Sequence, residues 1–159
     1  MTTTRRNLLV SVLLGTSLFA IAVPVSHAAF HVLRQRYSSW SYYPSRTYYY
    51  RHYYYKPTVT YPTYKHHYCI YYPTRPSYVY YYNPGTQVYW GRYDLKEGGY
   101  SLLKEEDRKG DLDQIPESAF PKPGEMPMIP ESNDGERIER PDPDDLPNLD
   151  APTDIPSGL

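Results

Sequence analysis

Between Ala29 and Tyr93 the sequence contains no aspartate or glutamate, although the chain of 159 residues has 18 acidic residues. This stretch carries six arginines and two lysines, a net charge of +8 with neutral histidines. Residues 94–159 hold all the acids against seven bases, a net charge of −11. We expect the two halves to attract each other, within one chain or between chains, and salt to screen that attraction over about 10 Å at 0.1 M.

Aliphatic residues are also scarce. Leucine, isoleucine, valine and phenylalanine number 19 in residues 29–159, about 15%, whereas chains below roughly 20% tend to be disordered. This shortage argues against a large aliphatic core. The 21 tyrosines must supply the bulk of any core, and each buried hydroxyl then needs a hydrogen-bond partner.

Motifs of catalysis are missing as well. The sequence has no G-x-S-x-G, no H-E-x-x-H, no phosphate loop and no C-x-x-C, so we predict a non-enzymatic protein without a cofactor. His66, His67 and Cys69 could ligate zinc or copper, but no fourth ligand is evident. The aspartates near residue 144 lack the spacing of a calcium loop. We therefore predict no metal site.

Cys69 is the only cysteine, which excludes a disulfide within the chain. It predicts an intermolecular disulfide or a free thiol.

Residues 1–28 have the layout of a secretory signal peptide, with Arg5 and Arg6 before an apolar stretch and cleavage expected between Ala28 and Ala29. An uncleaved anchor is the alternative. The arginine pair also fits the twin-arginine route. No later segment is apolar for long enough to span a bilayer, so we predict a secreted, periplasmic or cell-envelope protein without a transmembrane span after cleavage.

Residues 29–77 are predicted to be a basic, tyrosine-rich, low-complexity arm. Runs such as YYY have neither a period of 2 nor one of 3.6, and prolines recur at positions 57, 62, 73 and 76. Prolines at this spacing argue against a central strand or a long helix. An extended, partly polyproline-like conformation is therefore expected.

Residues 78–115 are predicted to be a small module with three aromatic strands between 78 and 103. Asn83-Pro84-Gly85-Thr86 is a strong turn signal, and it places Tyr82 opposite Gln87, Tyr80 opposite Tyr89 and Val79 opposite Trp90. A short helix over 104–109 follows. Residues 116–159 are predicted to be a disordered, acidic, proline-rich tail. The fold class is thus mostly disordered or irregular, with one small all-β element.

The tyrosines suggest three uses. Contacts of arginine and lysine with tyrosine give cohesion, about 0.5–1 kcal/mol each when exposed. Oxidised phenols outside the cell can couple into dityrosine, and aromatic rings can stack on sugars. Nucleic acid is not an expected partner of an exported protein. The adhesive or cross-linking candidates are Tyr48, Tyr49, Tyr50, Tyr53, Tyr54, Tyr55, Tyr61 and Tyr64.

Two resemblances follow from these residues. KPTVTYPTYK, residues 56–65, resembles the decapeptides of marine byssal adhesive proteins. Residues 78–130 resemble a class of short exported bacterial proteins, tyrosine-rich and then proline-rich, around a YWGRYD…GGYSLL centre that is here Tyr89 to Asp94 and Gly98 to Leu103. The second resemblance implies export and a shared small module, and it implies no particular activity.

The sequence therefore predicts a cell-envelope or extracellular-matrix protein that adheres, through many weak contacts, to an anionic polymer or to other copies of itself. The alternative is a small carbohydrate-binding module of the envelope. Its expected ligand platform consists of Tyr80, Tyr89, Trp90 and Tyr93.

Overall fold

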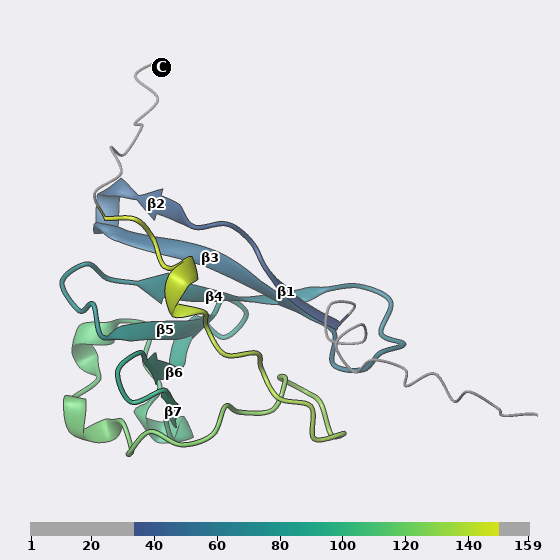
Figure 1. Cartoon of the computed structure of the whole chain (residues 1–159). Coiled ribbons are helices and arrows are strands. Elements are labelled where there is room, and N and C mark those ends of the chain that lie inside the picture. Colours follow the sequence, from purple (N-terminus) through teal and green to yellow (C-terminus); the bar gives the residue numbers. More distant parts are fainter. Residues whose placement is uncertain (1–33, 150–159) are drawn as a thin grey trace, which may run out of the picture.

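Seven consecutive strands pair in an antiparallel sheet that curls into a half-barrel in the computed structural model, which describes residues 34–149 (Figure 1). Their order in the sheet is β1-β3-β4-β5-β6-β7, and β2 also pairs with β3, beside β1. Among residues 35–149 there is no α-helix. The strands are β1 (Gln35–Tyr37), β2 (Ser41–Tyr43), β3 (Tyr48–Tyr55), β4 (Lys65–Tyr71), β5 (Tyr78–Asn83), β6 (Val88–Asp94) and β7 (Gly99–Leu102).

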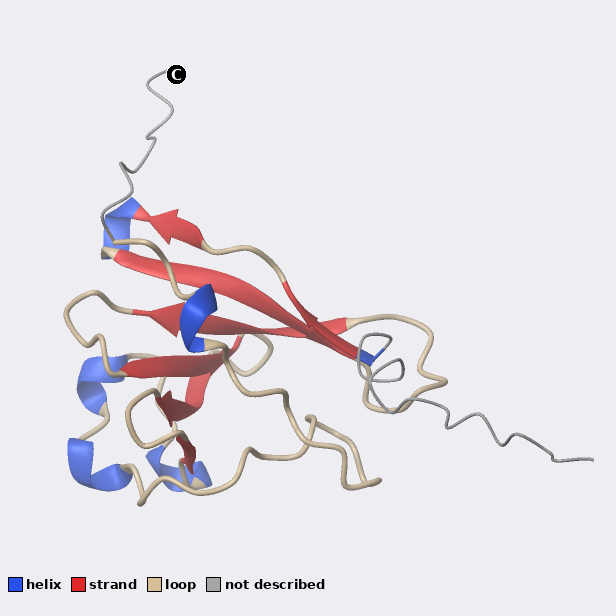
Figure 2. Ribbon diagram, viewed as in Figure 1, coloured by secondary structure: helices blue, strands red, loops and turns tan. Residues whose placement is uncertain are grey.

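The prediction of a mostly disordered chain is therefore wrong. The arm expected at 29–77 contains four of the seven strands, and β4 pairs with β5 across the expected boundary between 77 and 78. The strands expected between 78 and 103 are present as β5, β6 and β7, but they belong to this larger sheet. The expected helix over 104–109 is only a 3₁₀ turn, η2 (Glu105–Asp107) (Figure 2).

Tyrosine occupies both faces of β3, and this is why the sequence shows no period of 2 there. Along this strand Arg51, Tyr53 and Tyr55 are buried, while Tyr50, His52 and Tyr54 between them are half-buried. The residues alternate as strand geometry requires. A hydropathy pattern cannot detect this alternation when the same amphipathic side chain serves on both faces.

The prolines delimit the strands instead of breaking them. Pro57 and Pro62 lie in the loop between β3 and β4, and Pro73 and Pro76 lie in the loop between β4 and β5. Proline cannot donate a ladder hydrogen bond, so it is tolerated in these connections and excluded from the strands themselves. The spacing of the prolines therefore marks the loops between consecutive antiparallel strands.

The β5–β6 hairpin forms at the expected turn but in a different register. Asn83 pairs with Val88, and its side-chain oxygen accepts hydrogen bonds from the backbone N–H groups of Gly85 at 2.8 Å and Thr86 at 3.4 Å. Tyr82 therefore faces Tyr89. A β-bulge then places two residues, Trp90 and Gly91, opposite the single residue Tyr81. The expected pairs Tyr80–Tyr89 and Val79–Trp90 are wrong because the turn register differs by two residues, and the bulge then shifts the pairing by one more, so that Tyr80 faces Arg92 and Val79 faces Tyr93.

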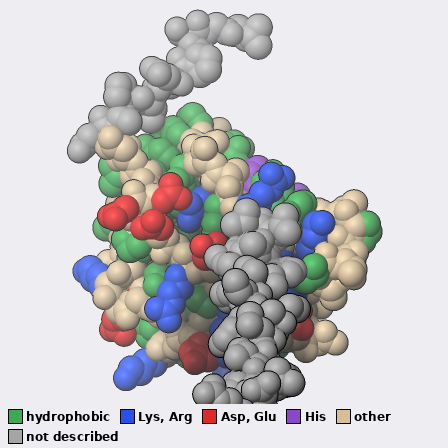
Figure 3. Space-filling model, turned by 45° about the vertical axis from the view of Figure 1, so that its right-hand side comes forward, with side chains coloured by type: hydrophobic (Ala, Val, Ile, Leu, Met, Phe, Trp, Pro, Cys, Tyr) green, Lys and Arg blue, Asp and Glu red, His purple; other side chains and the backbone are tan. Residues whose placement is uncertain are grey.

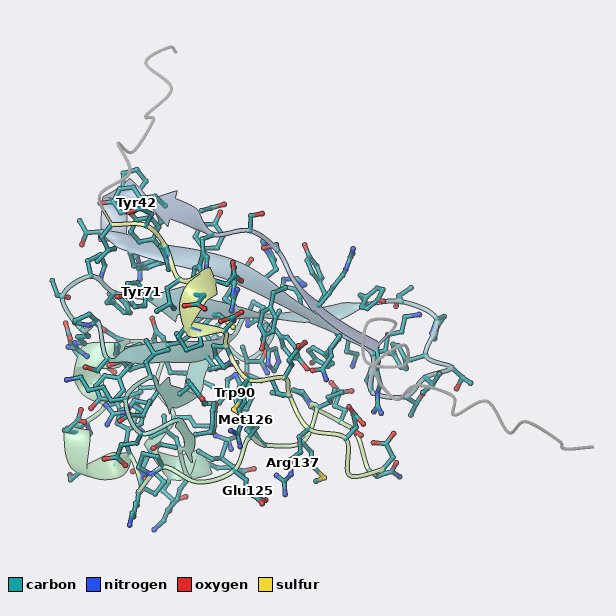
Figure 4. All side chains as sticks on the ribbon, in the orientation of Figure 1. Tyr42, Tyr71, Trp90, Glu125, Met126 and Arg137 are labelled. Carbon is teal, nitrogen blue, oxygen red and sulfur yellow. The ribbon has the colours of Figure 1, made fainter. Side chains whose placement is uncertain are left out.

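The proline-rich segment expected to be a disordered tail covers one face of the sheet. We call this the covered face. Figure 1 shows the yellow-green segment crossing the sheet from β7 towards β2 and β3, and two isolated bridges, Tyr100–Gly124 and Met128–Arg137, fix its path. Met126, beside Trp90 in Figure 4, belongs to one buried cluster with the sheet residues of this face. Its other buried members from the segment are Ile129 and Ile138.

Backbone and side-chain hydrogen bonds hold the same segment along β1. The Tyr37 hydroxyl donates to the Glu139 carbonyl oxygen at 2.8 Å, and the Trp40 indole N–H donates to the Asp145 carbonyl oxygen at 2.6 Å. Gln35 donates to the Arg137 carbonyl oxygen at 3.0 Å and accepts from the Glu139 N–H at 3.1 Å. These hydrogen bonds fix the position of the segment on the sheet, so only a few isoleucine and methionine side chains are needed to hold it there by apolar contact.

The opposite face is covered only in part. Leu103, Leu112 and Ile115, from the η2 region and η3 (Leu112–Gln114), pack with Ile70 and Tyr80 over β4, β5 and β6. η4 (Glu117–Ala119) continues this cover, and η5 (Pro143–Asp145) lies at the end of the segment on the covered face. Over β2, β3 and β4 this second face remains partly open.

The predicted signal peptide, residues 1–28, and residues 150–159 of the predicted tail lie outside the described residues. Within residues 34–149 no helix is long and apolar enough to cross a membrane.

Candidate binding face of tyrosine and histidine

The open part of the sheet presents a continuous aromatic surface, which we call the tyrosine face. Strand alternation brings its members to one side of β2, β3 and β4. Neighbouring rings lie 4.9–6.5 Å apart, mostly edge to face, a spacing that stabilises aromatic pairs. The members are Tyr43, Tyr48, Tyr50, His52, Tyr54, His66 and Tyr68.

A pocket of about 360 Å³ opens at one end of the tyrosine face. Tyr82 and Tyr89 from the neighbouring strands and Arg46 from η1 (Pro44–Arg46) complete its wall. No carboxylate is among the lining residues. The volume falls in the range of pockets that hold small ligands. The full lining is Tyr43, Arg46, Tyr48, Tyr50, Tyr68, Ile70, Tyr82, Tyr89 and Gly110.

Burial keeps two phenols of this pocket, Tyr48 and Tyr89, protonated. The hydroxyls of Tyr72 and Tyr89 lie 2.8 Å apart. Burial raises the pKa of the Tyr89 phenol well above its usual value, and the hydrogen bond with Tyr72 raises it further. Burial also raises the pKa of Tyr48, on the pocket wall. These groups therefore act at neutral pH as hydrogen-bonding phenols and flat ring surfaces, and not as phenolates.

Most of the positive charge of the first half of the chain is paired with the acidic half. The ion pairs are Arg34–Asp134 at 2.7 Å, Arg51–Asp145 and Lys65–Glu131 at 2.5 Å, Arg75–Asp113 at 2.8 Å, and Arg92–Glu117. Figure 3 shows acidic and basic side chains next to one another on one side of the molecule. The expected attraction between the halves is therefore satisfied inside one chain.

The remaining cations of the first half border the tyrosine face. The Arg36 guanidinium lies over the Tyr54 and Tyr64 rings, 4.9 and 5.0 Å from their centroids, and the Lys56 ammonium lies 4.9 Å from the Tyr64 ring. Arg46 stands at the pocket. An anionic group bound on this face would therefore meet cations at both ends.

The four residues of the expected ligand platform do not lie together. Tyr89 lines the pocket, and Tyr80 is 1% exposed beneath the 3₁₀ turns on the same face. Trp90 and Tyr93 are buried in the cluster of the covered face. Strand alternation puts Trp90 on the opposite face from Tyr89, and the bulge puts Tyr93 there too, so the four residues do not form one platform and only Tyr89 borders the open face.

The expected adhesive or cross-linking tyrosines also divide. Tyr48, Tyr50 and Tyr54 lie on the tyrosine face, whereas Tyr53 and Tyr55 are buried on the covered face at 0% and 2% exposure. The Tyr53 hydroxyl donates to the Gln35 side-chain oxygen at 2.8 Å, and burial raises the pKa of Tyr55 to about 12. These two are core residues. The other three, Tyr49, Tyr61 and Tyr64, are half-buried.

Cys69 is fully buried on the covered face, with 0% exposure. Burial raises the pKa of its thiol to about 12. Of the two expected states, an intermolecular disulfide is therefore not available to the folded chain, and Cys69 is a free thiol. His67 lies on the same face as Cys69, and His66 lies on the opposite face, so the three do not converge. Residues 34–149 contain no group of three or more histidine, cysteine, aspartate or glutamate side chains placed to hold a metal ion.

Sequence reasoning missed the pocket residues Tyr43, Arg46, Tyr68 and Tyr82. The signal for Tyr68 was alternation with His66 and Ile70 on one strand, which an assignment of this stretch to a disordered arm concealed.

Comparison of the chain with protein-family models, with curated proteins and with solved structures finds no match.

Proposed function

We propose that the chain is an exported, non-enzymatic polysaccharide-binding protein of the cell envelope or extracellular matrix, and that the tyrosine face is its binding surface. One observation carries the proposal: six tyrosines and Arg46 line one open pocket that has no carboxylate in its wall. Ring faces carry partial negative charge and pack against the C–H groups of sugars, while the phenol hydroxyls and the guanidinium can bond to sugar hydroxyls and acidic substituents.

The charge around the face favours an anionic polysaccharide over a neutral one. Arg46 lies at the pocket and Arg36 lies at the far end of the tyrosine face. Neither forms an ion pair within residues 34–149. An extended polymer along β3 would pass both. Each rim cation adds little alone, but sites in a row act together on one polymer.

Adhesion through a flexible basic arm to the acidic tail of another copy has less support. Five of the bases needed for it are already paired with acids of the same chain. Three of these five side chains are also buried, Arg34, Arg51 and Arg92, at 5%, 1% and 7% exposure. The proposed interaction is therefore that of a preformed face with a polymer.

The test is binding of the full chain to solid-phase polysaccharides, with immobilised alginate as an anionic probe and cellulose as a neutral one. Tyr50→Ala removes a ring from the pocket wall and should weaken binding by about tenfold or more, equivalent to roughly 1.4 kcal/mol. Tyr42→Ala is the matched control, because Tyr42 is also half-buried on this edge but packs on Tyr49 at 4.9 Å, away from the pocket.

Arg46→Ala should weaken alginate binding more than cellulose binding, because only alginate is charged. Failure of the unaltered chain to bind any polysaccharide would overturn the proposal. Equal losses in Tyr50→Ala and Tyr42→Ala would also overturn it, because binding would then not depend on the pocket.

A further inference from the structure

Two histidines lie side by side on the tyrosine face, away from the pocket. His52 of β3 pairs with Tyr68 of β4, and Tyr54 pairs with His66, so the histidines are diagonal neighbours across the two strands. Their ring centroids are 5.2 Å apart and their planes are inclined by 56°.

This separation is the one that two imidazoles adopt around a shared metal ion. With a metal–nitrogen distance of about 2.0–2.1 Å and a further ~1.2 Å from nitrogen to ring centroid, each centroid lies about 3.2 Å from the metal. At a tetrahedral angle of about 109° the two centroids are then about 5.2 Å apart. The strand register thus places the rings of His52 and His66 at the separation that one shared ion requires.

Both imidazoles are available for such a bond. Within residues 34–149 their ring nitrogens make no hydrogen bond, while His66 is exposed and His52 is half-buried. Tyrosine rings hold the pair in place. Tyr54 stacks on His52 at 5.3 Å with an interplanar angle of 7°, and Tyr68 lies 4.9 Å from His52 and 5.5 Å from His66. Fixed rings lose little side-chain entropy when they bind an ion.

We propose that His52 and His66 form a binding site for a late first-row divalent metal ion. Neutral imidazole suits Zn²⁺, Ni²⁺ and Cu²⁺, and the general order of affinity makes Cu²⁺ the tightest of the three. Two protein ligands leave the other positions of the ion to water, because no third histidine, cysteine or acid is near within the described residues. An ion bound at this site exchanges with solution, and its binding does not depend on the proposed polysaccharide binding.

The test is calorimetric titration of the full chain with ZnCl₂ and with CuCl₂, without any polysaccharide. We expect one ion per chain at this site and tighter binding of Cu²⁺. His52→Gln and His66→Gln should each weaken binding by at least about tenfold, since each breaks the chelate. His31→Gln is the matched control and should leave this binding unchanged in the chain that retains residues 1–28; in a chain cleaved after Ala28, Ala29-Phe30-His31 would be an amino-terminal copper site of its own.

Nuclear magnetic resonance gives a second readout that does not require a variant. Substoichiometric Cu²⁺ should broaden the imidazole signals of His52 and His66 before that of His67, which is buried on the other face. Equal affinity in the two Gln variants and the unaltered chain would overturn the proposal. Broadening of His67 or His31 ahead of this pair would overturn it as well.

Discussion

The buried guanidinium of Arg51 is paired with the carboxylate of Asp145, which lies 94 residues further along the chain, at 2.5 Å. The guanidinium also lies over the rings of Tyr37 and Trp40, 4.2 and 4.6 Å from their centroids. The Arg51 side chain is 1% exposed and the Asp145 side chain is 66% exposed. A cation in the core of the covered face is thus neutralised from the surface by the last described part of the chain.

Asp145→Ala should lower the free energy of unfolding by about 1–3 kcal/mol, because it leaves a buried cation without its anion. Asp144→Ala is the matched control on the same turn and should change stability by less than about 0.5 kcal/mol. Urea denaturation of the three proteins measures both. Equal midpoints for Asp145→Ala and the unaltered chain would show that the ring faces alone satisfy Arg51.

Removal of residues 121–159 should prevent the sheet from folding. The deletion uncovers Trp90, Tyr100 and their neighbours, and it takes away three buried side chains, each worth about 1.5–3 kcal/mol. Their sum is comparable with the whole stability of a typical domain, about 5–15 kcal/mol. Circular dichroism and binding of a hydrophobic dye would detect the loss. A disordered tail, in contrast, could be removed without effect. The buried side chains concerned are Met126, Ile129 and Ile138.

Gly91 is required by close packing at the β-bulge. A Cβ atom there would lie 2.6 Å from the Ser101 carbonyl oxygen and closer still to the Tyr100 hydroxyl. We expect Gly91→Ala to cost about 2 kcal/mol or more, since overpacking forces a backbone shift. Gly124→Ala is the matched control, because its Cβ would meet only the Tyr100 carbonyl oxygen, at 4.0 Å. The two thermal midpoints should differ by several degrees.

His67 should make the protein less stable in mild acid. Burial, and to a lesser extent the charge of His66, lowers the pKa of His67 from 6.5 to about 4. Below pH 6.5 the unfolded chain takes up a proton there and the folded chain does not until about pH 4, so stability falls over this window, by up to about 3 kcal/mol. Above pH 7 the effect is absent.

His67→Phe isolates this effect. The unaltered chain should lose stability between pH 7 and pH 5, above the range in which carboxylates titrate, and His67→Phe should lose less. The pKa of His52 is also lowered, by partial burial and by His66, and it contributes in the same direction to both proteins. Identical slopes against pH for the two proteins would contradict the assignment to His67.

Cys69 should be unreactive until the chain unfolds. Its thiol is inaccessible and its pKa is raised to about 12 by burial, while only the thiolate attacks a disulfide reagent. Addition of a chromogenic disulfide at pH 8 should give no signal in buffer and one thiol per chain in urea. The chain should also migrate as a monomer in denaturing gels without reductant when it is denatured in the presence of an alkylating agent. Rapid modification of the native chain would mean that β4 opens readily.

Local signals predicted the parts of the fold that depend on local chemistry. Asn83 and Gly85 marked a turn, and the turn is there. The charge division predicted an attraction that the structure satisfies through pairs such as Arg92–Glu117. The bulge at Trp90 was not predicted, although a glycine inside a strand, here Gly91, often marks one.

The largest errors came from residues whose role depends on distant contacts. Tyr53 and Tyr54 are the same residue type, yet one is in the core and the other is on the open face. Ile129 and Ile138 are isolated among prolines and acids, and composition alone places them in a disordered tail. They are buried because they cover the sheet, and the hydropathy pattern does not reveal a sheet built from tyrosine. The tyrosine face could not be predicted for the same reason.

The position of Asp145 has a consequence for how the chain is made. Synthesis proceeds from β1 towards the segment that covers the sheet, and contacts such as Gln35–Arg137 and Trp40–Asp145 span 102 and 105 residues. Folding that relies on contacts so distant in sequence is slow. A nascent chain that has reached only Leu102 has all seven strands but no carboxylate for Arg51 and no cover for Trp90. The fold is therefore completed only after the residues around Asp145 have been added, 94 residues beyond the arginine that this carboxylate neutralises.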